Sequence, residues 1–518
     1  MARAFDPART RRSLFDALLD AKALVGGAAP ILEDHERRPL TYTDLVRASF
    51  ALGRKLKALT VEGERVGLLL PSSVGMTAAF FALHAIGRTP VMLNYSSGAR
   101  NLKAACQAAG VRRVLSARRF IEMGKLEPLA EELFAVVEVT WLDDLRASIG
   151  PADKAYAAVA GLLPRLFRKR THPDAPGVIL FTSGSFGAPR GVVLSQANLL
   201  ANVEQVAAHI DLDPKWVFFS PLPTFHALGL IALILPLLEG MRGFQYPSPL
   251  HFKQIPPLVR ESGAAVLFAT DTFLNQYIRA AADDDLAGLR FVVCGAEKVR
   301  DDTRRLFAGR FGEAPLLEGY GATEASPVIA VNQPEHNVSG TVGRLLPGVE
   351  TRLEPVEGIT GGGRLYVRGP NLMSGYLGAS PGVVEPLPDG WHDTGDVASV
   401  DADGVVSLLG RVKRFAKLGG EMVSLTAVED LAAAAWPGAR HAAVSIPDPR
   451  KGERLVLFTD QAGAEPSVLV ACARAYGAPE LAVPKRIVVL PAVPVLGSGK
   501  TDYVSVQKLA EAENQAAA

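Results

Sequence analysis

A glycine-rich loop between two apolar runs constrains the fold of this chain more than any other feature. Residues 178–180 are long enough for a buried strand, and a second apolar run follows at 192–194. Between them, three glycines let backbone N–H groups turn toward an anion, while hydroxyl groups and an arginine add donors. The loop lacks the Gly-Lys-Ser/Thr ending of a Walker A loop. It therefore predicts a polyphosphate site of another kind; the alternative is a flexible surface loop.

The residues of this loop that we expect at the phosphates are Thr182, Ser183, Gly184, Ser185, Gly187 and Arg190.

Short apolar runs alternate with longer helical patterns through the first four hundred residues. Residues 66–70, 89–93, 266–268 and 291–294 are typical of strands, and residues 75–86 are typical of a helix. This alternation predicts parallel sheets flanked by helices. Ligands in such folds bind beyond the carboxyl ends of strands, where Thr182, Gly295 and Tyr320 all fall.

Composition narrows the class of protein. A chain of 518 residues, with 48% hydrophobic and 21% charged residues, is typical of a soluble protein with at least two domains. The formal net charge of +1 argues against nucleic acid as a partner. Three widely spaced cysteines indicate reduced thiols, neither a disulfide framework nor a metal site. The apolar run 227–238 is too short to span a bilayer and contains Pro236, so we expect a core helix and a cytoplasmic protein.

Four further segments accompany the loop: Glu-Gly-Tyr-Gly-Ala-Thr-Glu at 318–324, Trp-His-Asp-Thr-Gly-Asp at 391–396, Gly-Arg-Val-Lys at 410–413 and Gly-Ser-Gly-Lys at 497–500. Their order and spacing resemble the adenylate-forming (AMP-binding) superfamily, over nearly the whole chain. Within it, residues 199–205, 246–251, 295–298, 414–417 and 480–484 most resemble the ligase half of the bacterial bifunctional 2-acylglycerophosphoethanolamine acyltransferase/acyl-[acyl-carrier-protein] synthetase.

The resemblance implies an acyl-CoA synthetase-like α/β fold. A large N-terminal domain, residues 1–410, would combine parallel and mixed sheets with flanking helices and bind nucleotide and acyl group. Residues 411–413 would be a hinge, and residues 414–518 a small, mobile α+β domain carrying a catalytic lysine. The implied reaction uses ATP and Mg²⁺ to convert a fatty acid to its acyl-adenylate, followed by thioester formation on acyl carrier protein. A fatty acyl-CoA synthetase is the alternative, and a catalytically silent binding protein is a third.

The site residues follow from the resemblance, position by position. Thr182 and its loop would clamp the β- and γ-phosphates, although Arg190 stands where the family usually has lysine. Glu324 would bind Mg²⁺, unless it is an ordinary surface glutamate. Lys500 would bridge carboxylate and α-phosphate. The remaining assignments are Thr323 at the α-phosphate; Gly295, Ala296, Glu297, Gly319, Tyr320 and Gly321 at adenine; Asp396 and Arg411 at the ribose; His226 at the acyl tunnel; Gly419 and Gly420 at the thiol tunnel; and Lys413 at the hinge.

Two of these assignments have simple structural alternatives. Tyr320 can be a core aromatic residue, and His226 can be a buried histidine whose hydrogen bonds are satisfied. The segment after His226, residues 227–230, is apolar where amino-acid-activating relatives carry an acidic residue, so an uncharged aliphatic acid is favoured. No histidine is followed five positions later by aspartate, so we expect no lysophospholipid acylation.

Two segments bear on partners. Basic residues of the C-terminal part, at 413–414, 417, 450–451 and 485–486, suit an acidic carrier protein, unless they are scattered solvated charges. Residues 156–170 combine apolar spacing with a basic end, a pattern that can lie peripherally on the inner face of an anionic membrane. The alternative for residues 156–170 is a connector helix packed on the body of the protein.

Overall fold

Two large sheets form most of the N-terminal part. The computed structural model describes residues 3–183, 189–312, 314–357, 359, 361–380, 382–418, 421–448, 452–476, 483–496 and 500–516. The first sheet has the order β19-β18-β8-β7-β4-β3-β5-β6; the run from β7 to β6 is parallel, whereas β8, β18 and β19 pair antiparallel. Its members are β3 (Arg65–Leu68), β4 (Thr89–Met92), β5 (Arg113–Ser116), β6 (Glu138–Trp141), β7 (Pro176–Ser183), β8 (Pro189–Ser195), β18 (Gly375–Leu377) and β19 (Val384–Glu385).

The second sheet has the order β15-β14-β13-β12-β11-β9-β10-β1-β2 and is parallel from β1 to β13. Its members are β1 (Pro30–Asp34), β2 (Leu40–Thr41), β9 (Val217–Ser220), β10 (Arg242–Gln245), β11 (Val266–Ala269), β12 (Phe291–Cys294), β13 (Leu316–Gly321), β14 (Val328–Val331) and β15 (Arg344–Leu345). The parallel strands are almost continuously buried, as expected of strands that are covered on both faces.

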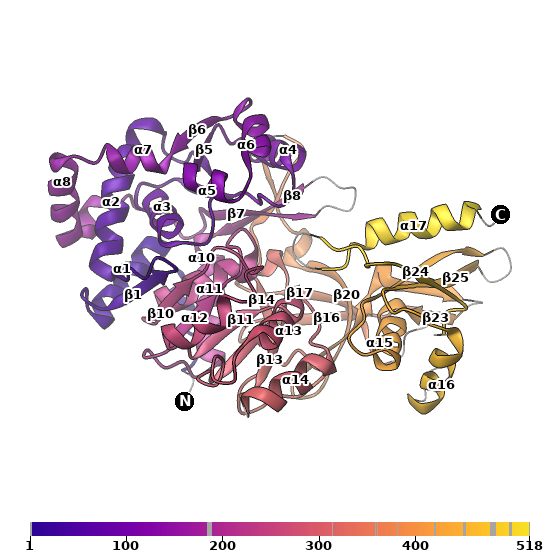
Figure 1. The fold of residues 1–518 in the computed structure, drawn as a ribbon. Helices are drawn as coiled ribbons and strands as arrows, with labels where there is room; N and C mark the ends of the chain where they lie inside the picture. The colour runs from indigo at the N-terminus through magenta and orange to yellow at the C-terminus, as the bar shows by residue number, and fades with distance from the viewer. Residues whose placement is uncertain are drawn as a thin grey trace.

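Helices cover both sheets (Figure 1). They are α1 (Leu14–Val25), α2 (Tyr42–Leu59), α3 (Val74–Ala85), α4 (Ala99–Ala109), α5 (Arg118–Met123), α6 (Glu127–Phe134), α7 (Leu142–Ala147), α8 (Pro151–Leu162), α9 (Pro164–Phe167), α10 (Gln196–His209), α11 (Ala227–Leu238), α12 (Ile255–Ser262), α13 (Asp271–Ala280) and α14 (Asp301–Phe311), with 3₁₀ turns η1 (Pro7–Thr10), η2 (Thr323–Ala325), η3 (Pro388–Gly390) and η4 (Val412–Arg414).

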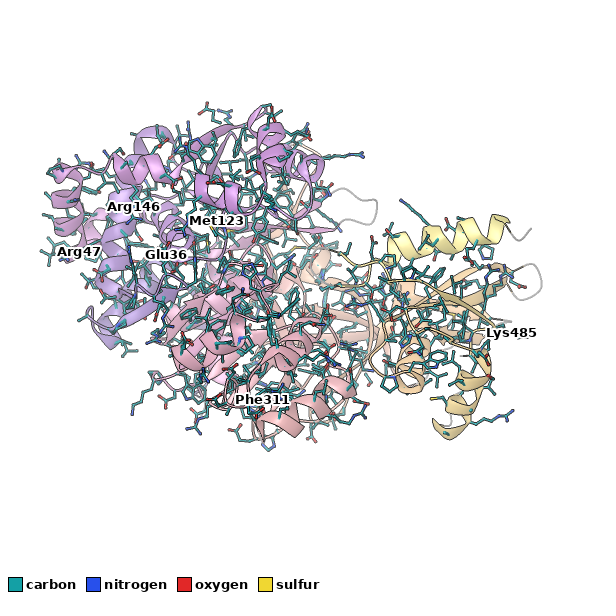
Figure 2. The ribbon with its side chains drawn as sticks, in the orientation of Figure 1. Glu36, Arg47, Met123, Arg146, Phe311 and Lys485 are labelled. Atoms are coloured by element: carbon teal, nitrogen blue, oxygen red, sulfur yellow. The ribbon has the colours of Figure 1, made fainter. Side chains whose placement is uncertain are left out.

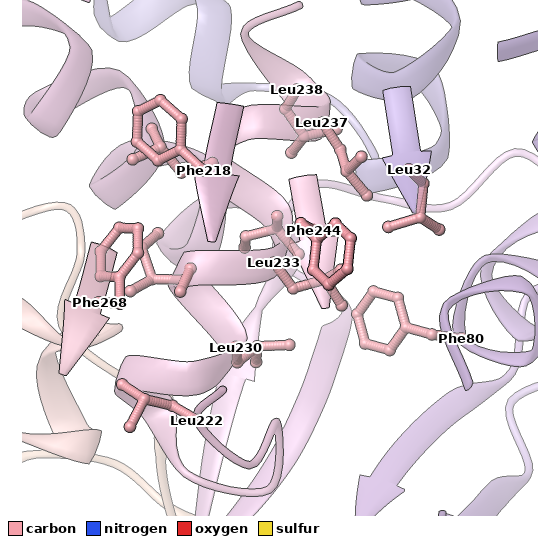
Figure 3. Close-up of a cluster of buried hydrophobic side chains, with 14 of the residues drawn as sticks. Leu32, Phe80, Phe218, Leu222, Leu230, Leu233, Leu237, Leu238, Phe244 and Phe268 are labelled. Atoms are coloured by element: carbon pink, nitrogen blue, oxygen red, sulfur yellow. The ribbon is translucent and has the colours of Figure 1, made fainter. Parts of the chain in front are cut away.

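The apolar run 227–238 is a core helix, as predicted. All residues of α11 except Leu228 are buried. Figure 3 shows Leu230 and Leu233 of α11 in one cluster with Phe218 and Phe244, from neighbouring strands of the second sheet. The same cluster includes Phe80 of α3, so helices of both sheets share one core. Within the residues that the structure describes, no helix is both long and apolar enough to cross a membrane.

A third sheet follows the large ones, with the order β16-β17-β20-β21. Its strands are β16 (Glu350–Glu354), β17 (Gly363–Arg368), β20 (His392–Val400) and β21 (Val406–Arg411), and all of them pair antiparallel. The mixed α/β architecture with parallel and mixed sheets confirms the predicted fold class.

The C-terminal residues build a sheet of their own, and it lies at one end of the molecule (Figure 1). Its elements are β22 (Phe415–Leu418), β23 (Glu421–Ser424), α15 (Leu425–Ala435), β24 (His441–Asp448), β25 (Gly452–Thr459), α16 (Pro466–Tyr476), β26 (Arg486–Val489) and α17 (Tyr503–Ala516). Two apolar clusters inside it contain only residues of this C-terminal part. Ion pairs join it to the rest of the chain: Lys298 Nζ lies 2.8 Å from Asp430 and Lys417 Nζ lies 3.2 Å from Glu357.

Candidate active site

The predicted phosphate loop connects an antiparallel hairpin. Thr182 on β7 pairs with Arg190 on β8 at the end of this hairpin next to the connecting loop. Ser195 caps α10 directly after β8: its Oγ accepts from the Asn198 N–H at 3.0 Å, and Asn198 Oδ1 accepts from the Ser195 N–H at 2.9 Å. Such a cap stabilises a helix by ~1 kcal/mol and fixes how the chain leaves the hairpin. The side chain of Ser183 and the predicted residues Gly184, Ser185 and Gly187 lie outside the described residues.

Tyr376 joins the hairpin to the predicted metal ligand. Its hydroxyl donates to Glu324 Oε1 at 2.8 Å, and the Arg190 guanidinium carbon lies 3.3 Å from the centre of its ring. The contact arises because β18 pairs with β8, with Tyr376 opposite Val192. Burial, followed by the charge of Glu324, raises the pKa of Tyr376 well above its usual value, so the phenol stays a hydrogen-bond donor.

Glu324 has the chemistry of a magnesium ligand that acts together with phosphate. No hydrogen bond to its second oxygen, Oε2, occurs among the described residues, while Tyr376 orients the first. In the part of the chain that the structure describes, no three His, Cys, Asp or Glu side chains gather to hold a metal on their own. Mg²⁺ prefers one or two carboxylates plus phosphate oxygens, and a single oriented carboxylate beside a phosphate loop fits that preference.

A second group of side chains lies where β13 and β20 meet. The Tyr320 hydroxyl donates to Asp396 Oδ2 at 2.5 Å, and Arg411 Nε donates to Asp396 Oδ1 at 2.9 Å. Asp396 and Arg411 are opposite each other in the β20–β21 ladder. Each carboxylate oxygen can accept a further hydrogen bond, so Asp396 keeps capacity for the hydroxyls of a ribose.

His392, at the start of β20, lies between the two groups. It is buried, and burial lowers its pKa; Arg190 acts in the same direction, whereas Glu324 and Asp396 raise it. His392 is therefore within electrostatic range of both Glu324 and Asp396.

The segment after β12 contributes a carboxylate with spare hydrogen-bonding capacity. Ala296 has a φ of +68°, a left-handed conformation that is uncommon outside glycine. The next residue, Glu297, accepts a hydrogen bond through Oε2 from the Thr272 N–H at 3.0 Å. Its other oxygen, Oε1, is buried and has no hydrogen-bond partner among the described residues. A buried, unpaired carboxylate oxygen is costly and is therefore typical of a binding site.

Lys500 reaches this site from the C-terminal part of the chain. Burial lowers its pKa, Arg411 lowers it further, and Glu297 opposes the shift. Lys500 in turn helps to lower the pKa of His226 to about 4, although burial is the larger cause. The Lys500 ammonium is therefore within electrostatic range of Glu297, Arg411 and His226. Its side chain still touches solvent, and His226 is neutral at physiological pH.

Some predicted residues remain apart from this site. Lys413 lies in η4 and is exposed, so its hinge role stays a prediction. Gly419 and Gly420 lie outside the described residues. Thr323 begins η2, directly before Glu324.

The sequence profile of the AMP-binding enzyme family matches residues 19–377. This chain belongs to the AMP-binding enzyme family. Its members belong to the adenylate-forming superfamily, which activates a carboxylic acid as the acyl-adenylate.

Curated relatives of this AMP-binding enzyme are similar over most of their length. A feruloyl-CoA synthase of Amycolatopsis sp. is 31% identical over 481 residues, covering 90% of this chain and 93% of the relative. A medium-chain fatty-acid–CoA ligase of Escherichia coli K12 is 26% identical, covering 92% and 86%. Among solved structures, ATP-bound MatB from Rhodopseudomonas palustris superposes with a TM-score of 0.81 at 23% identity, over 96% of this chain and 99% of that one. The last comparison supports the fold.

The sequence did not reveal two residues of this AMP-binding enzyme's site, Tyr376 and His392. Tyr376 stands in an ordinary strand pattern and becomes part of the site only through the pairing of β18 with β8. His392 could have been recognised from the sequence, because it belongs to the same short segment, Trp-His-Asp-Thr-Gly-Asp, as Asp396.

Replacing Tyr376 with Phe should raise the Mg²⁺ concentration for half-maximal adenylation about tenfold. The variant keeps the ring under Arg190 but removes a hydrogen bond to a charged carboxylate, worth ~1.5 kcal/mol. Calorimetry should show a matching loss in MgATP affinity with little change for ATP alone. Tyr156→Phe is the matched control, since Tyr156 also lies under an arginine, Arg54, but far along the chain from the site. An unchanged Mg²⁺ dependence would mean that the Tyr376 hydroxyl does not position Glu324.

Proposed function

We propose that this AMP-binding enzyme activates a fatty acid with ATP and transfers the acyl group to the phosphopantetheine thiol of acyl carrier protein. The observation that carries the proposal is the pair of hydrogen bonds that Tyr320 and Arg411 donate to Asp396, with Lys500 of the C-terminal part within electrostatic range of Arg411 and Glu297. A lysine beside nucleotide-type ligands is what the first half-reaction requires.

In that half-reaction, a carboxylate oxygen attacks the α-phosphorus of ATP and pyrophosphate leaves. The Lys500 ammonium stabilises the charge that develops between carboxylate and α-phosphate, while Arg190 and the hairpin loop hold the β- and γ-phosphates. Tyr320, Asp396 and Arg411 orient the adenosine. Glu324, together with phosphate oxygens, would hold Mg²⁺, which would supply positive charge to neutralise the phosphates.

In the second half-reaction, the thiol sulfur attacks the acyl carbonyl carbon, and AMP leaves. We propose that residues 411–413 act as a hinge between residues 1–410 and 414–518, and that rotation about it removes Lys500 and admits the thiol beside Gly419 and Gly420. The sheet and apolar clusters formed only by C-terminal residues support this division.

The residues around the proposed acyl site favour an uncharged, aliphatic acid as the substrate. His226 is neutral, and Ala227, Gly229 and Leu230 follow it as buried, apolar residues of α11. No acidic residue stands in this segment to hold an amino group. Burial of each methylene contributes ~0.8 kcal/mol, so chain length alone can supply the affinity.

The acceptor has two candidates that expose the same thiol. Carrier protein is supported by the resemblance to the carrier-dependent ligase, whereas CoA is supported by curated relatives named as fatty-acid–CoA ligases. The basic residues expected at an acidic carrier are fewer than the sequence indicated. Arg414 is internal, bonded to Glu429 and stacked on Tyr503, and Arg486 bonds Glu513. Lys413 and Lys485 remain exposed, while Arg450 and Lys451 lie outside the described residues.

Fatty-acid-dependent exchange of pyrophosphate into ATP tests the first half-reaction. Folded protein with no exchange across medium- and long-chain acids would make it the silent relative, despite the presence of Glu324, Asp396, Arg411 and Lys500.

A radiolabelled fatty acid offered to holo acyl carrier protein and CoA side by side should label the carrier protein preferentially. The KM for the carrier should rise with salt, because screening weakens attraction between exposed cations and an acidic partner. Efficient transfer to CoA with none to the carrier would assign the chain to the fatty acyl-CoA synthetases instead.

A further inference from the structure

The junction of α8 and α9 presents a row of apolar side chains to solvent. We call these residues the α8–α9 apolar surface: Val159 (49% exposed), Leu162 (74%), Leu163 (53%), Leu166 (77%) and Phe167 (37%). Single exposed leucines are normal on a soluble protein, but a dense group within one short segment marks an interaction surface.

Packing on the other side of these two helices fixes the orientation of the surface. Ala157, Ala160 and Gly161 are buried, and Gly161 lies so close to the Arg47 side chain that a Cβ would be 2.8 Å from Arg47 Cγ. Arg165 Nη1 lies 3.3 Å from Asp16 Oδ1, which ties α9 to α1. The side of α8 and α9 that carries the exposed leucines is therefore turned away from the core.

Cations surround the α8–α9 apolar surface. Arg47, Lys154 and Arg170 are exposed and form no ion pair with any other described residue. Lys22 is close to the same place, since its Nζ donates to the Gly161 carbonyl at 3.2 Å, and burial and then Arg47 lower its pKa. Arg47 lies at the α8 end of the molecule (Figure 2).

The acidic groups nearby do not offset this charge. Asp16 and Asp20 pair with Arg165, Asp153 lies 2.7 Å from Lys55 Nζ, and Glu62 lies 2.8 Å from Lys169 Nζ. Apart from Asp44, which caps α2 through Thr41, the unpaired charges around the surface are thus positive, which complements a negatively charged partner.

We propose that the α8–α9 apolar surface docks on an anionic lipid bilayer. Leu162, Leu163 and Leu166 enter the boundary between headgroups and acyl chains, and the surrounding cations contact lipid phosphates. A surface with only a few leucines and cations binds a membrane reversibly, and binding requires both the apolar and the electrostatic contribution. The surface is at the opposite end of the molecule from α17 and the C-terminal sheet, so docking leaves that sheet unobstructed (Figure 1).

Sedimentation with vesicles tests the proposal, using phosphatidylcholine mixed with phosphatidylglycerol against phosphatidylcholine alone. Wild type should bind the mixed vesicles, and the bound fraction should fall as salt rises. Leu162→Ser/Leu166→Ser should weaken binding by about tenfold or more. Met123→Ser/Val136→Ser is the matched control, since those side chains are 69% and 62% exposed elsewhere, and it should bind like wild type. Lys154→Glu/Arg170→Glu should weaken binding to mixed vesicles only.

The proposal is overturned if wild type fails to bind mixed vesicles, or if the two serine variants bind them equally. If wild type does not bind vesicles but forms a dimer in analytical ultracentrifugation, and Leu162→Ser/Leu166→Ser dissociates that dimer, the surface belongs to contact with a second copy of the chain. Thermal unfolding confirms that each variant is folded. Neither ATP nor fatty acid is present, so the result is independent of the proposed function.

Discussion

Lys500→Ala should slow acyl-adenylate formation at least about a hundredfold and spare transfer from pre-made acyl-adenylate to the thiol. The ammonium is needed where charge develops at the α-phosphate, and loss of such a transition-state contact costs ~3 kcal/mol or more. Pyrophosphate exchange measures the first half-reaction, and single-turnover thioester formation measures the second. Lys485→Ala, in the same C-terminal part but exposed at its far side, is the matched control and should leave both rates unchanged (Figure 2).

The pH dependence offers a second check on Lys500. Because burial lowers its pKa, the ammonium is lost as pH rises through a value below that of an ordinary lysine. Adenylation by wild type should therefore decline on the alkaline side earlier than expected, and the residual activity of Lys500→Ala should lack this decline. Equal loss of both half-reactions in the alanine variant would contradict the two-conformation scheme.

Glu324→Gln should reduce adenylation about a hundredfold or more and abolish the preference for MgATP over ATP. The amide is nearly isosteric and its carbonyl can still accept from Tyr376, so only the negative charge is lost. Removing one preorganised electrostatic contact in such a site typically costs a few kcal/mol. Calorimetric titration with ATP, with and without Mg²⁺, measures the effect apart from turnover.

Glu385→Gln is the control for this substitution, since Glu385 is an exposed glutamate on β19, opposite Tyr376 in the β18–β19 ladder. Its Mg²⁺ dependence should equal that of wild type. If Glu324→Gln still prefers MgATP as strongly as wild type, Glu324 is not the metal ligand.

Local patterns predicted several elements of the N-terminal part. The helix expected at 75–86 is α3, Val74–Ala85, and the strand expected at 66–70 is β3, Arg65–Leu68. These succeed because a buried helix or parallel strand is a continuous apolar run with polar or glycine residues at its ends. The hairpin of β7 and β8 was not anticipated: the loop between them is too short for a crossover, so the strands are antiparallel.

The same distinction between local patterns and distant pairing applies to the residues of the candidate site. Residues inside distinctive segments, such as Tyr320, Asp396 and Arg411, could be grouped from sequence, and the structure brings them into contact. Tyr376 could not, because it reaches Glu324 only through strand pairing between distant segments. Charge was equally ambiguous: Arg414 looked like a surface cation, yet it pairs with Glu429 inside the C-terminal part.

The pairing of Asp396 with Arg411 has a consequence for how binding and movement relate. Arg411 ends β21, and the next residues form η4, from which the chain enters the C-terminal sheet. A nucleotide that hydrogen-bonds Asp396 thereby alters the last fixed contact before that exit. If nucleotide binding favours one orientation of the C-terminal part, that orientation raises the affinity for the nucleotide by the same factor, because such coupling is reciprocal. If residues 411–413 act as the proposed hinge, a change of nucleotide at Asp396 acts on Arg411, the first residue of that hinge.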